Sequence, residues 1–132
     1  MIFVDTSAWF ARYVPTETDH ASARAVISAA RPESLVTSDF VLDETLTLFQ
    51  ARGEFQRAKE VGRRVLEQSI CRLIRVEETD IVKAWTIFAR HCEQRWSFTD
   101  CTSLSLMQRL AIKTACAFDE HYRQFGGIEV LP

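Results

Sequence analysis

Two carboxylates of the chain stand directly after apolar segments that resemble buried strands. Asp5 follows residues 2–4 (IFV), and Asp119 follows the run ACAF at 115–118. A carboxylate at the end of a strand that is buried on both faces is costly unless a charged partner meets it there. The carboxyl ends of parallel strands share one edge of a sheet, so we expect both acids to lie at the same edge.

A third carboxylate, Glu44, is predicted to face the core from a helix. In the segment FVLDETLTLF it shares a face with Val41 and Leu48 by the three-and-four spacing of a helix. Its neighbour Asp43 shares a face with Thr47 instead and is expected to point to water. Of two adjacent acids, therefore, only Glu44 is a candidate for the site.

The fourth carboxylate is Asp100, which lies on the same helical stripe as Leu104 and Met107. Four inward acids in one place would repel one another and shift toward protonation. The segments around them offer no Lys or Arg that is expected to be buried. A divalent cation is the expected partner, and all-oxygen ligands suit Mg²⁺ or Mn²⁺, which also bind phosphates.

The elements that must position these acids alternate between strand and helix. Strands are predicted at residues 2–4, 35–37, 71–76, 115–118 and 128–131, and helices at 7–13, 19–30, 39–52, 54–68, 79–93 and from residue 99 or 100 onward. This alternation, with few hairpin signals, favours an α/β fold with a mostly parallel sheet covered on both faces. At 132 residues the chain fits a single domain, 1–132.

Composition restricts the environment and the partners. The net charge of -2 supplies no general attraction for nucleic acid, so any such contact must be local. Four cysteines without a CxxC pair, and an apolar start interrupted by Asp5, favour reduced thiols in a cytoplasmic protein without a signal peptide. The longest apolar runs have four residues, far below the roughly 20 needed to span a bilayer, so we expect no membrane partner.

Four motifs together resemble the PIN domain family, and more narrowly the VapC-type ribonuclease toxins of bacterial toxin–antitoxin pairs. They are MIFVDTSAWF at the start, VLDETL in the middle, SFTDCTSLSLM later and AFDEHYRQFGGIEVLP at the end. Each motif alone is weak, but their order, separation and extent over nearly the whole chain are specific. By this resemblance Asp5, Glu44, Asp100 and Asp119 fall on the acidic quartet of the family, with a hydroxyl at Thr6 or Ser7 assisting the first acid.

The resemblance implies a three-layer α/β/α fold with a five-stranded parallel sheet. It also implies a metal-dependent endoribonuclease that cleaves single-stranded or structured RNA, a cognate antitoxin that inserts a peptide into the acidic groove, and a homodimer. We expect Asp5, Asp100 and Asp119 to hold one Mg²⁺ or Mn²⁺, and Glu44 to anchor a second ion or orient the attacking water. Thr6 or Ser7 would hydrogen-bond a metal ligand or the scissile phosphate.

Positive charge near the groove would have to come from a small set of side chains, namely Arg12, Arg52, Arg57, Lys59, Arg63 and Arg64. Because acids are interleaved among residues 52–67, a solvated helix face is the simpler interpretation of most of them. None of the three histidines stands in a position that recommends it as the general base, although His121 is two residues from Asp119. Adjacent His91 and Cys92 without a second pair favour packing over a zinc site.

Simpler alternatives exist for several of these residues. Asp100 and Asp119 could each be helix N-caps, and so could Thr6 and Ser7 for the first helix. The aromatic residues expected in the core are Trp9, Phe10, Phe49 and Phe55. An aspartyl-phosphate phosphatase would need a second acid where Ser7 stands, and a response-regulator receiver an acidic pair near the start and a late Lys. The remaining alternative is a PIN-like module that binds RNA or protein without cutting.

Overall fold

Five short parallel strands form one sheet in the computed structural model, which describes residues 1–132. The strands are β1 (Ile2–Val4), β2 (Leu35–Ser38), β3 (Arg72–Ile74), β4 (Thr114–Cys116) and β5 (Glu129–Leu131). They are arranged in the order β3-β2-β1-β4-β5, and every neighbouring pair is parallel. The predicted five-stranded parallel sheet is therefore confirmed.

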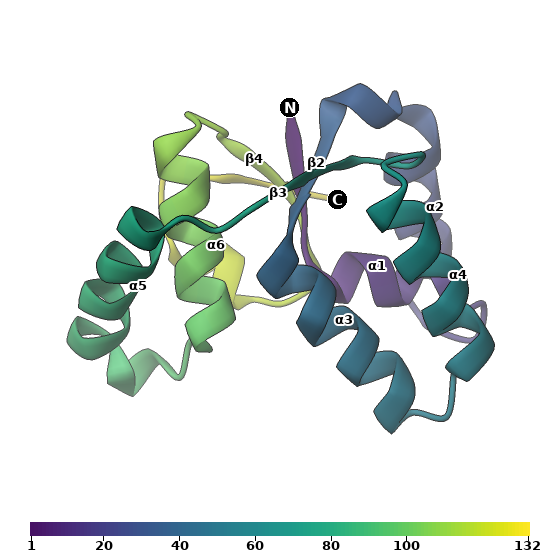
Figure 1. Cartoon of the computed structure of the whole chain (residues 1–132), viewed down its shortest axis with the longest axis horizontal. Helices are drawn as coiled ribbons and strands as arrows, with labels where there is room; N and C mark the ends of the chain where they lie inside the picture. The colour runs from purple at the N-terminus through teal and green to yellow at the C-terminus, as the bar shows by residue number, and fades with distance from the viewer.

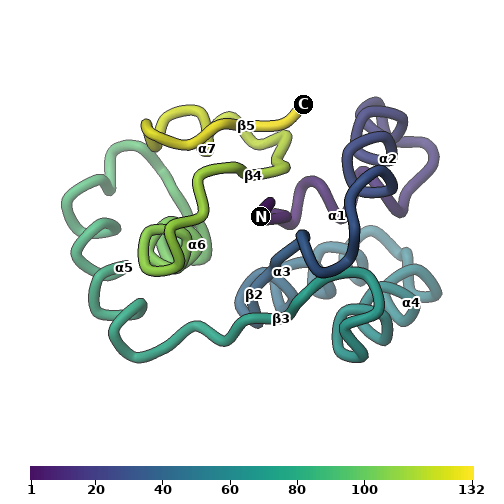
Figure 2. The backbone as a smooth tube through the Cα atoms, turned by 90° about the horizontal axis from the view of Figure 1, so that it is seen from above, coloured from purple at the N-terminus to yellow at the C-terminus, as the bar shows by residue number.

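Helices cover both faces of this sheet. They are α1 (Thr6–Tyr13), α2 (His20–Ala29), α3 (Asp39–Ala51), α4 (Phe55–Leu66), α5 (Glu78–Arg90), α6 (Phe98–Arg109) and α7 (His121–Gln124), with short 3-10 turns at Pro32–Ser34 and Cys92–Gln94. Seen from above, α1, α2 and α4 lie on one side of the sheet and α5 and α6 on the other (Figure 2). The result is the three-layer α/β/α arrangement that the resemblance implies.

The strand order reverses at β1, and this reversal locates the site. The chain runs from β1 outward to β2 and β3, then crosses back to β4 on the other side of β1. The backbone N–H of Asp5 still donates to the carbonyl of Cys116, so β1 and β4 stay paired to the end of β1. Figure 1 shows α1 and α3 beginning where β1 and β2 end, at the same edge of the sheet. In open parallel sheets ligands bind at such a reversal.

The core packs against both β1 and β2. Phe3, Val4, Trp9 and Phe49 are fully or almost fully buried. The indole N–H of Trp9 donates to Thr37 Oγ1 at 3.2 Å, and that hydroxyl donates to the carbonyl of Val4 at 2.9 Å, so the buried polar atoms of this layer are paired. This packing holds the first turn of α1 firmly against the end of β1.

Two predictions about these elements are wrong. The strand predicted over 115–118 ends at Cys116, because the N–H of Phe118 donates to Ser7 Oγ instead of continuing the ladder, so Asp119 lies in a loop three residues past the strand. Phe55 is 57% exposed and not in the core, since it is the first residue of α4 and lies at the corner after α3. The other elements are where the sequence predicts them and differ only at their ends.

The three other aromatic residues expected in the core, Trp9, Phe10 and Phe49, are buried there. Gly53 closes α3 with a φ of +71°, as expected of a glycine that ends a helix. All four cysteines are free thiols, and only Cys92 is exposed. None of the helices has the length and apolar character needed to cross a membrane.

Candidate active site

A cavity of about 330 Å³ opens at the carboxyl edge of the sheet, beside the reversal of strand order. All six side chains that the sequence singles out line it: Asp5, Thr6, Ser7, Glu44, Asp100 and Asp119. Four more residues complete the wall: Leu48, Arg95, Ser97 and His121. Residues from opposite ends of the chain thus meet in one place.

Asp5 is the most enclosed of the acids, with 3% of its surface exposed. It is the N-cap of α1: its Oδ2 accepts from the backbone N–H of Ser7 at 3.1 Å and from the Ser7 hydroxyl at 2.8 Å. Its Oδ1 accepts from the hydroxyl of buried Tyr122 at 3.0 Å. Burial nevertheless raises the pKa of Asp5 from 3.8 to about 6, and the charge of Asp100 adds to this effect, while the donated hydrogen bonds oppose it.

The two hydroxyls after Asp5 both serve the structure of the site. Ser7 Oγ donates to Asp5 and accepts from the N–H of Phe118 at 3.0 Å, so it ties the first acid to the loop that carries Asp119. Thr6 Oγ1 donates to the carbonyl of Val41 at 3.4 Å and accepts from Thr45 Oγ1 at 3.2 Å. Thr6 therefore ties α1 to α3.

Asp100 is fixed at the start of α6 by a capping box. The N–H of Asp100 donates to Ser97 Oγ at 3.0 Å, and the N–H of Ser97 donates to Asp100 Oδ2 at 3.0 Å. Burial raises the pKa of Asp100, and the nearby carboxylate of Asp119 adds to the effect. The cap alone does not explain the residue, because its side chain lines the cavity as well.

Asp119 and Asp100 are joined by the imidazole of His121. The Nδ1 atom of His121 lies 3.2 Å from Asp100 Oδ2 and 3.2 Å from Asp119 Oδ1. The backbone N–H of His121 also donates to Asp119 Oδ1 at 2.9 Å, which fixes this carboxylate at the start of α7. Each of the three side chains offers one possible ligand atom, and these atoms lie within 4.8 Å of one another.

Glu44 completes the acidic wall from α3. It is partly buried, whereas the neighbouring Asp43 is exposed, as the helical spacing predicts. Burial raises the pKa of Glu44, and the charges of Asp100 and Asp119 contribute in the same direction, whereas the hydroxyls of Thr6 and Thr99 oppose it. The charges of the other acids therefore act on Glu44 across the cavity.

The donor set of this cavity suits a divalent cation. Burial and mutual repulsion raise the pKa of three of the four acids. None of the four forms an ion pair with a Lys or Arg; their only basic partner is His121. Carboxylate oxygens suit Mg²⁺ and Mn²⁺, and a cation placed among them would remove the repulsion that raises these pKa values.

Sequence reasoning missed three residues here. The sequence does not recommend His121 as a general base, yet its ring contacts two of the acids. The one sequence feature that indicates a role is its position two residues after Asp119. Tyr122 supplies the hydroxyl that the buried Asp5 needs, which the sequence did not indicate. Arg95, the only Lys or Arg in the cavity wall, has a φ of +59° after the 3-10 turn that ends at Gln94, and no spacing rule pointed to it.

Comparison with known proteins identifies the class to which this fold and site belong. The sequence profile of the PIN domain matches residues 2–128, and the chain belongs to the PIN domain family.

Within that family, the chain is similar to the 23S rRNA-specific endonuclease VapC20 of Mycobacterium tuberculosis, in strains CDC 1551 and H37Rv. The two are 35% identical over 132 residues, which is 100% of this chain and 99% of the relative. The crystal structure of M. tuberculosis VapC20, a Sarcin-Ricin loop cleaving toxin, superimposes with a TM-score of 0.90 and 32% identity over the whole of both chains.

More distant structures share the fold alone. FitAcB from Neisseria gonorrhoeae matches with a TM-score of 0.71 and 15% identity, over 100% of this chain and 97% of that one. A toxin-antitoxin complex from Klebsiella pneumoniae matches with a TM-score of 0.69 and 12% identity, again over 100% and 97%.

Proposed function

We propose that this protein is a divalent-metal-dependent endoribonuclease and the toxin of a toxin–antitoxin pair. The observation that carries the proposal is the convergence of Asp5, Glu44, Asp100 and Asp119 on one cavity without a Lys or Arg ion pair. Similarity to VapC20 over the full length supports RNA as the substrate. A cluster of this kind costs stability, so a chain that only bound RNA would have no evident reason to keep it.

In this proposal Asp5, Asp100 and Asp119 hold Mg²⁺ or Mn²⁺, with the His121 imidazole beside them. A bound ion would supply positive charge for the phosphoryl oxygens and would lower the pKa of a bound water, which is the chemistry that hydrolysis of a phosphodiester requires. Glu44 also lines the cavity and would orient the attacking water or hold a second ion.

The other residues of the site position these acids. Ser7 has its hydroxyl engaged by Asp5 and by Phe118 N–H, so its role is to hold the first acid in place and not to contact RNA. Tyr122 fixes the second oxygen of the same carboxylate. Thr6 links α1 to α3 and thereby sets the separation of Asp5 from Glu44.

The remaining features of the proposal follow from the family. The substrate is single-stranded or structured RNA, and 23S rRNA is the first to test, since it is the substrate named for VapC20. A cognate antitoxin covers the acidic cavity, the toxin is a homodimer in the cytoplasm, and residues 1–132 act as one PIN domain.

The test is cleavage of 23S rRNA, and of a short hairpin that carries its sarcin–ricin loop, by the purified chain. Reactions contain Mg²⁺, Mn²⁺ or a chelator, and the products are separated on a denaturing gel. We expect cleavage only with metal, and loss of at least a hundredfold in rate for Asp100→Asn. The matched control is Asp43→Asn, which removes an exposed carboxylate one residue from Glu44 and should cut like the parent.

Cleavage that continues undiminished in chelator or in Asp100→Asn would refute the assignment of the site. RNA binding without cleavage, with the same affinity in Asp100→Asn as in the parent, would identify a binding module instead. Calorimetric titration of Mg²⁺ and Mn²⁺ into the parent and into Asp100→Asn separates the metal site from the choice of RNA.

A further inference from the structure

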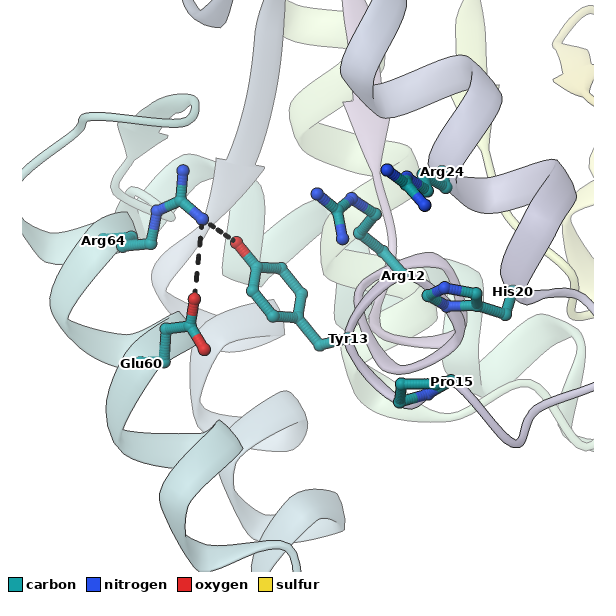
Figure 3. Close-up of a pocket in the computed structure, with 7 residues that line it drawn as sticks. All are labelled: Arg12, Tyr13, Pro15, His20, Arg24, Glu60 and Arg64. Carbon is teal, nitrogen blue, oxygen red and sulfur yellow. Dashed lines mark hydrogen bonds and ion pairs between the residues drawn. The ribbon is translucent and has the colours of Figure 1, made fainter.

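A second pocket, separate from the acidic cavity, is lined by basic side chains. It has a volume of about 310 Å³ and lies between the last turn of α1, the start of α2 and the second half of α4. Its walls carry Arg12, Arg24 and Arg64, with one acid, Glu60, and the ring of His20. Figure 3 shows the three arginines coming from three different helices. The three arginines and the single glutamate of the wall give a net charge of +2.

Two of these arginines have no carboxylate partner. Neither Arg12 nor Arg24 forms an ion pair, and Arg64 lies 3.7 Å from Glu60 while it donates to the Tyr13 hydroxyl at 3.0 Å. Two other arginines on α4 are neutralised locally: Arg57 pairs with Glu54 at 2.7 Å, and Arg63 with Glu67 at 3.0 Å. In a chain whose net charge is -2, the unpaired charge of the pocket is therefore a local feature.

Neighbouring contacts hold the pocket in shape. Tyr13 is buried, with the Arg12 guanidinium 5.2 Å from its ring centre and the Arg64 guanidinium on its hydroxyl, so one side chain positions two arginines (Figure 3). The Nδ1 of His20 is 2.8 Å from the carbonyl of Ala11, which orients Nδ1 as a donor to that carbonyl and leaves Nε2 free. Arg12, Arg64 and His20 are thus placed before any ligand arrives, whereas Arg24 adds its charge from an exposed position on α2.

The geometry points to a phosphate group as the ligand of this pocket, and we propose that it is a non-scissile phosphate of the RNA substrate. Guanidinium groups that line one pocket from three helices suit a tetrahedral anion, whereas a planar carboxylate is satisfied by a single guanidinium fork. A nucleobase is a poorer fit, because Arg12 covers the face of Tyr13 that a base would stack on.

The position of the pocket allows one RNA to reach both sites. Asp5 caps one end of α1 and Arg12 lies in its last turn, so at 1.5 Å per residue about 10 Å of helix separates the two along its axis. A phosphate held at the far end of α1 would fix the register of the RNA without reading its sequence. The RNA part of this inference rests on the proposed function, whereas phosphate binding by the pocket does not.

The first arm of the test measures RNA binding in chelator, so that no cleavage occurs. Anisotropy of a labelled sarcin–ricin hairpin is recorded at several salt concentrations for the parent, for Arg12→Gln/Arg24→Gln and for Lys113→Gln. Lys113 is an exposed lysine outside the pocket with no ion pair, so Lys113→Gln shows the effect of losing one positive charge elsewhere on the surface. We expect the double variant to bind about tenfold more weakly, with a slope of log K against log salt that is shallower by about 1.

The second arm titrates inorganic phosphate, and separately acetate, into the same three proteins and follows the arginine Nε–Hε signals by NMR. Phosphate should shift the signals of Arg12, Arg24 and Arg64 in the parent and have no comparable effect in the double variant. Circular dichroism checks that every variant is folded. In cleavage assays with metal, the double variant should show its defect mainly as a higher KM.

The outcomes are distinguishable. Equal RNA affinity and slope for the double variant and Lys113→Gln would overturn the RNA assignment, and phosphate shifts alone would then assign the pocket to a free phosphate ligand. Acetate shifts as large as those of phosphate, or no shifts at all, would overturn the phosphate site itself. If the parent neither binds nor cuts RNA but phosphate still shifts the arginines, the proposed function fails while the phosphate site stands.

Discussion

Replacing Asp5 by Asn should make the metal-free protein more stable while it abolishes cleavage. Burial raises the pKa of Asp5 from 3.8 to about 6, and at 1.36 kcal/mol per pKa unit this change corresponds to about 3 kcal/mol of destabilisation once the group is ionised. An asparagine keeps the shape and stays neutral, and the pKa of about 6 already includes the hydrogen bonds from Ser7 that favour the ionised carboxylate. The expected net gain in the free energy of unfolding is therefore about 3 kcal/mol at pH 7.5.

The pH dependence of this gain follows from the sign of the change. Below about pH 3.8 Asp5 is protonated in both the folded and the unfolded state, so its raised pKa costs nothing. Between pH 3.8 and about 6 the unfolded state ionises first, and the parent loses stability relative to Asp5→Asn. Above about pH 6 the difference stays constant. The advantage of the variant should therefore be small near pH 4 and complete near pH 7.

Urea denaturation in chelator, followed by circular dichroism at pH 4.5, 6.0 and 7.5, measures this difference directly. In a thermal scan at pH 7.5, the melting temperature of Asp5→Asn should lie roughly 5 to 10 °C above that of the parent. Asp43→Asn is the control, because it removes an exposed acid outside the cavity. A variant no more stable than the parent at pH 7.5, or an advantage that does not change with pH, would refute the claim that burial of this charge destabilises the protein.

Three further predictions concern the same architecture. Mn²⁺ at one hundred times its Kd should stabilise the folded parent by about 2.7 kcal/mol and so raise its melting temperature in a thermal scan. The same concentration should have little effect on the melting temperature of Asp100→Asn. Tyr122→Phe removes the hydroxyl that donates to Asp5 at 3.0 Å, so it should cost about 1 kcal/mol in urea denaturation and lower the cleavage rate about tenfold. Asp80→Asn weakens the pair between the buried Asp80 carboxylate and the exposed Arg109, whose Nε and Nη2 both lie 2.9 Å from that carboxylate, and should cost about 2 kcal/mol at pH 7 in urea denaturation.

The location of the acids was predictable because each prediction used a local pattern. The three-and-four spacing of a helix separated Glu44 from Asp43, and the structure places the first in the cavity wall and the second in solvent. An apolar run that ends in an acid marked Asp5 at the end of β1. Such patterns depend on a few neighbouring residues, which is why the sheet and most helix positions were also predicted.

What the sequence did not indicate depends on contacts between distant segments. The ring of His121 contacts Asp100, which lies 21 residues earlier in the chain. This contact depends on the loop after β4, which is held by the hydrogen bond from Phe118 N–H to Ser7 Oγ. The left-handed backbone of Arg95 at the end of a 3-10 turn has no sequence signal, since arginine rarely adopts it. Arg12 and Arg24 likewise line the same pocket because α1 packs against α2, and the spacing of the two residues in the sequence does not predict this packing.

The capping and catalytic interpretations of the acids turn out to be compatible. Asp5 caps α1, Asp100 belongs to the capping box of α6, and Asp119 accepts the N–H that opens α7. Each carboxylate uses one oxygen to accept backbone N–H groups at a helix start, where the partial positive charge of the helix also favours an anion. The same hydrogen bonds that begin three helices therefore limit the cost of gathering these charges and fix the direction of each side chain. An Asp-to-Asn change at any of them tests charge and cap separately, because the amide oxygen still accepts the cap hydrogen bond.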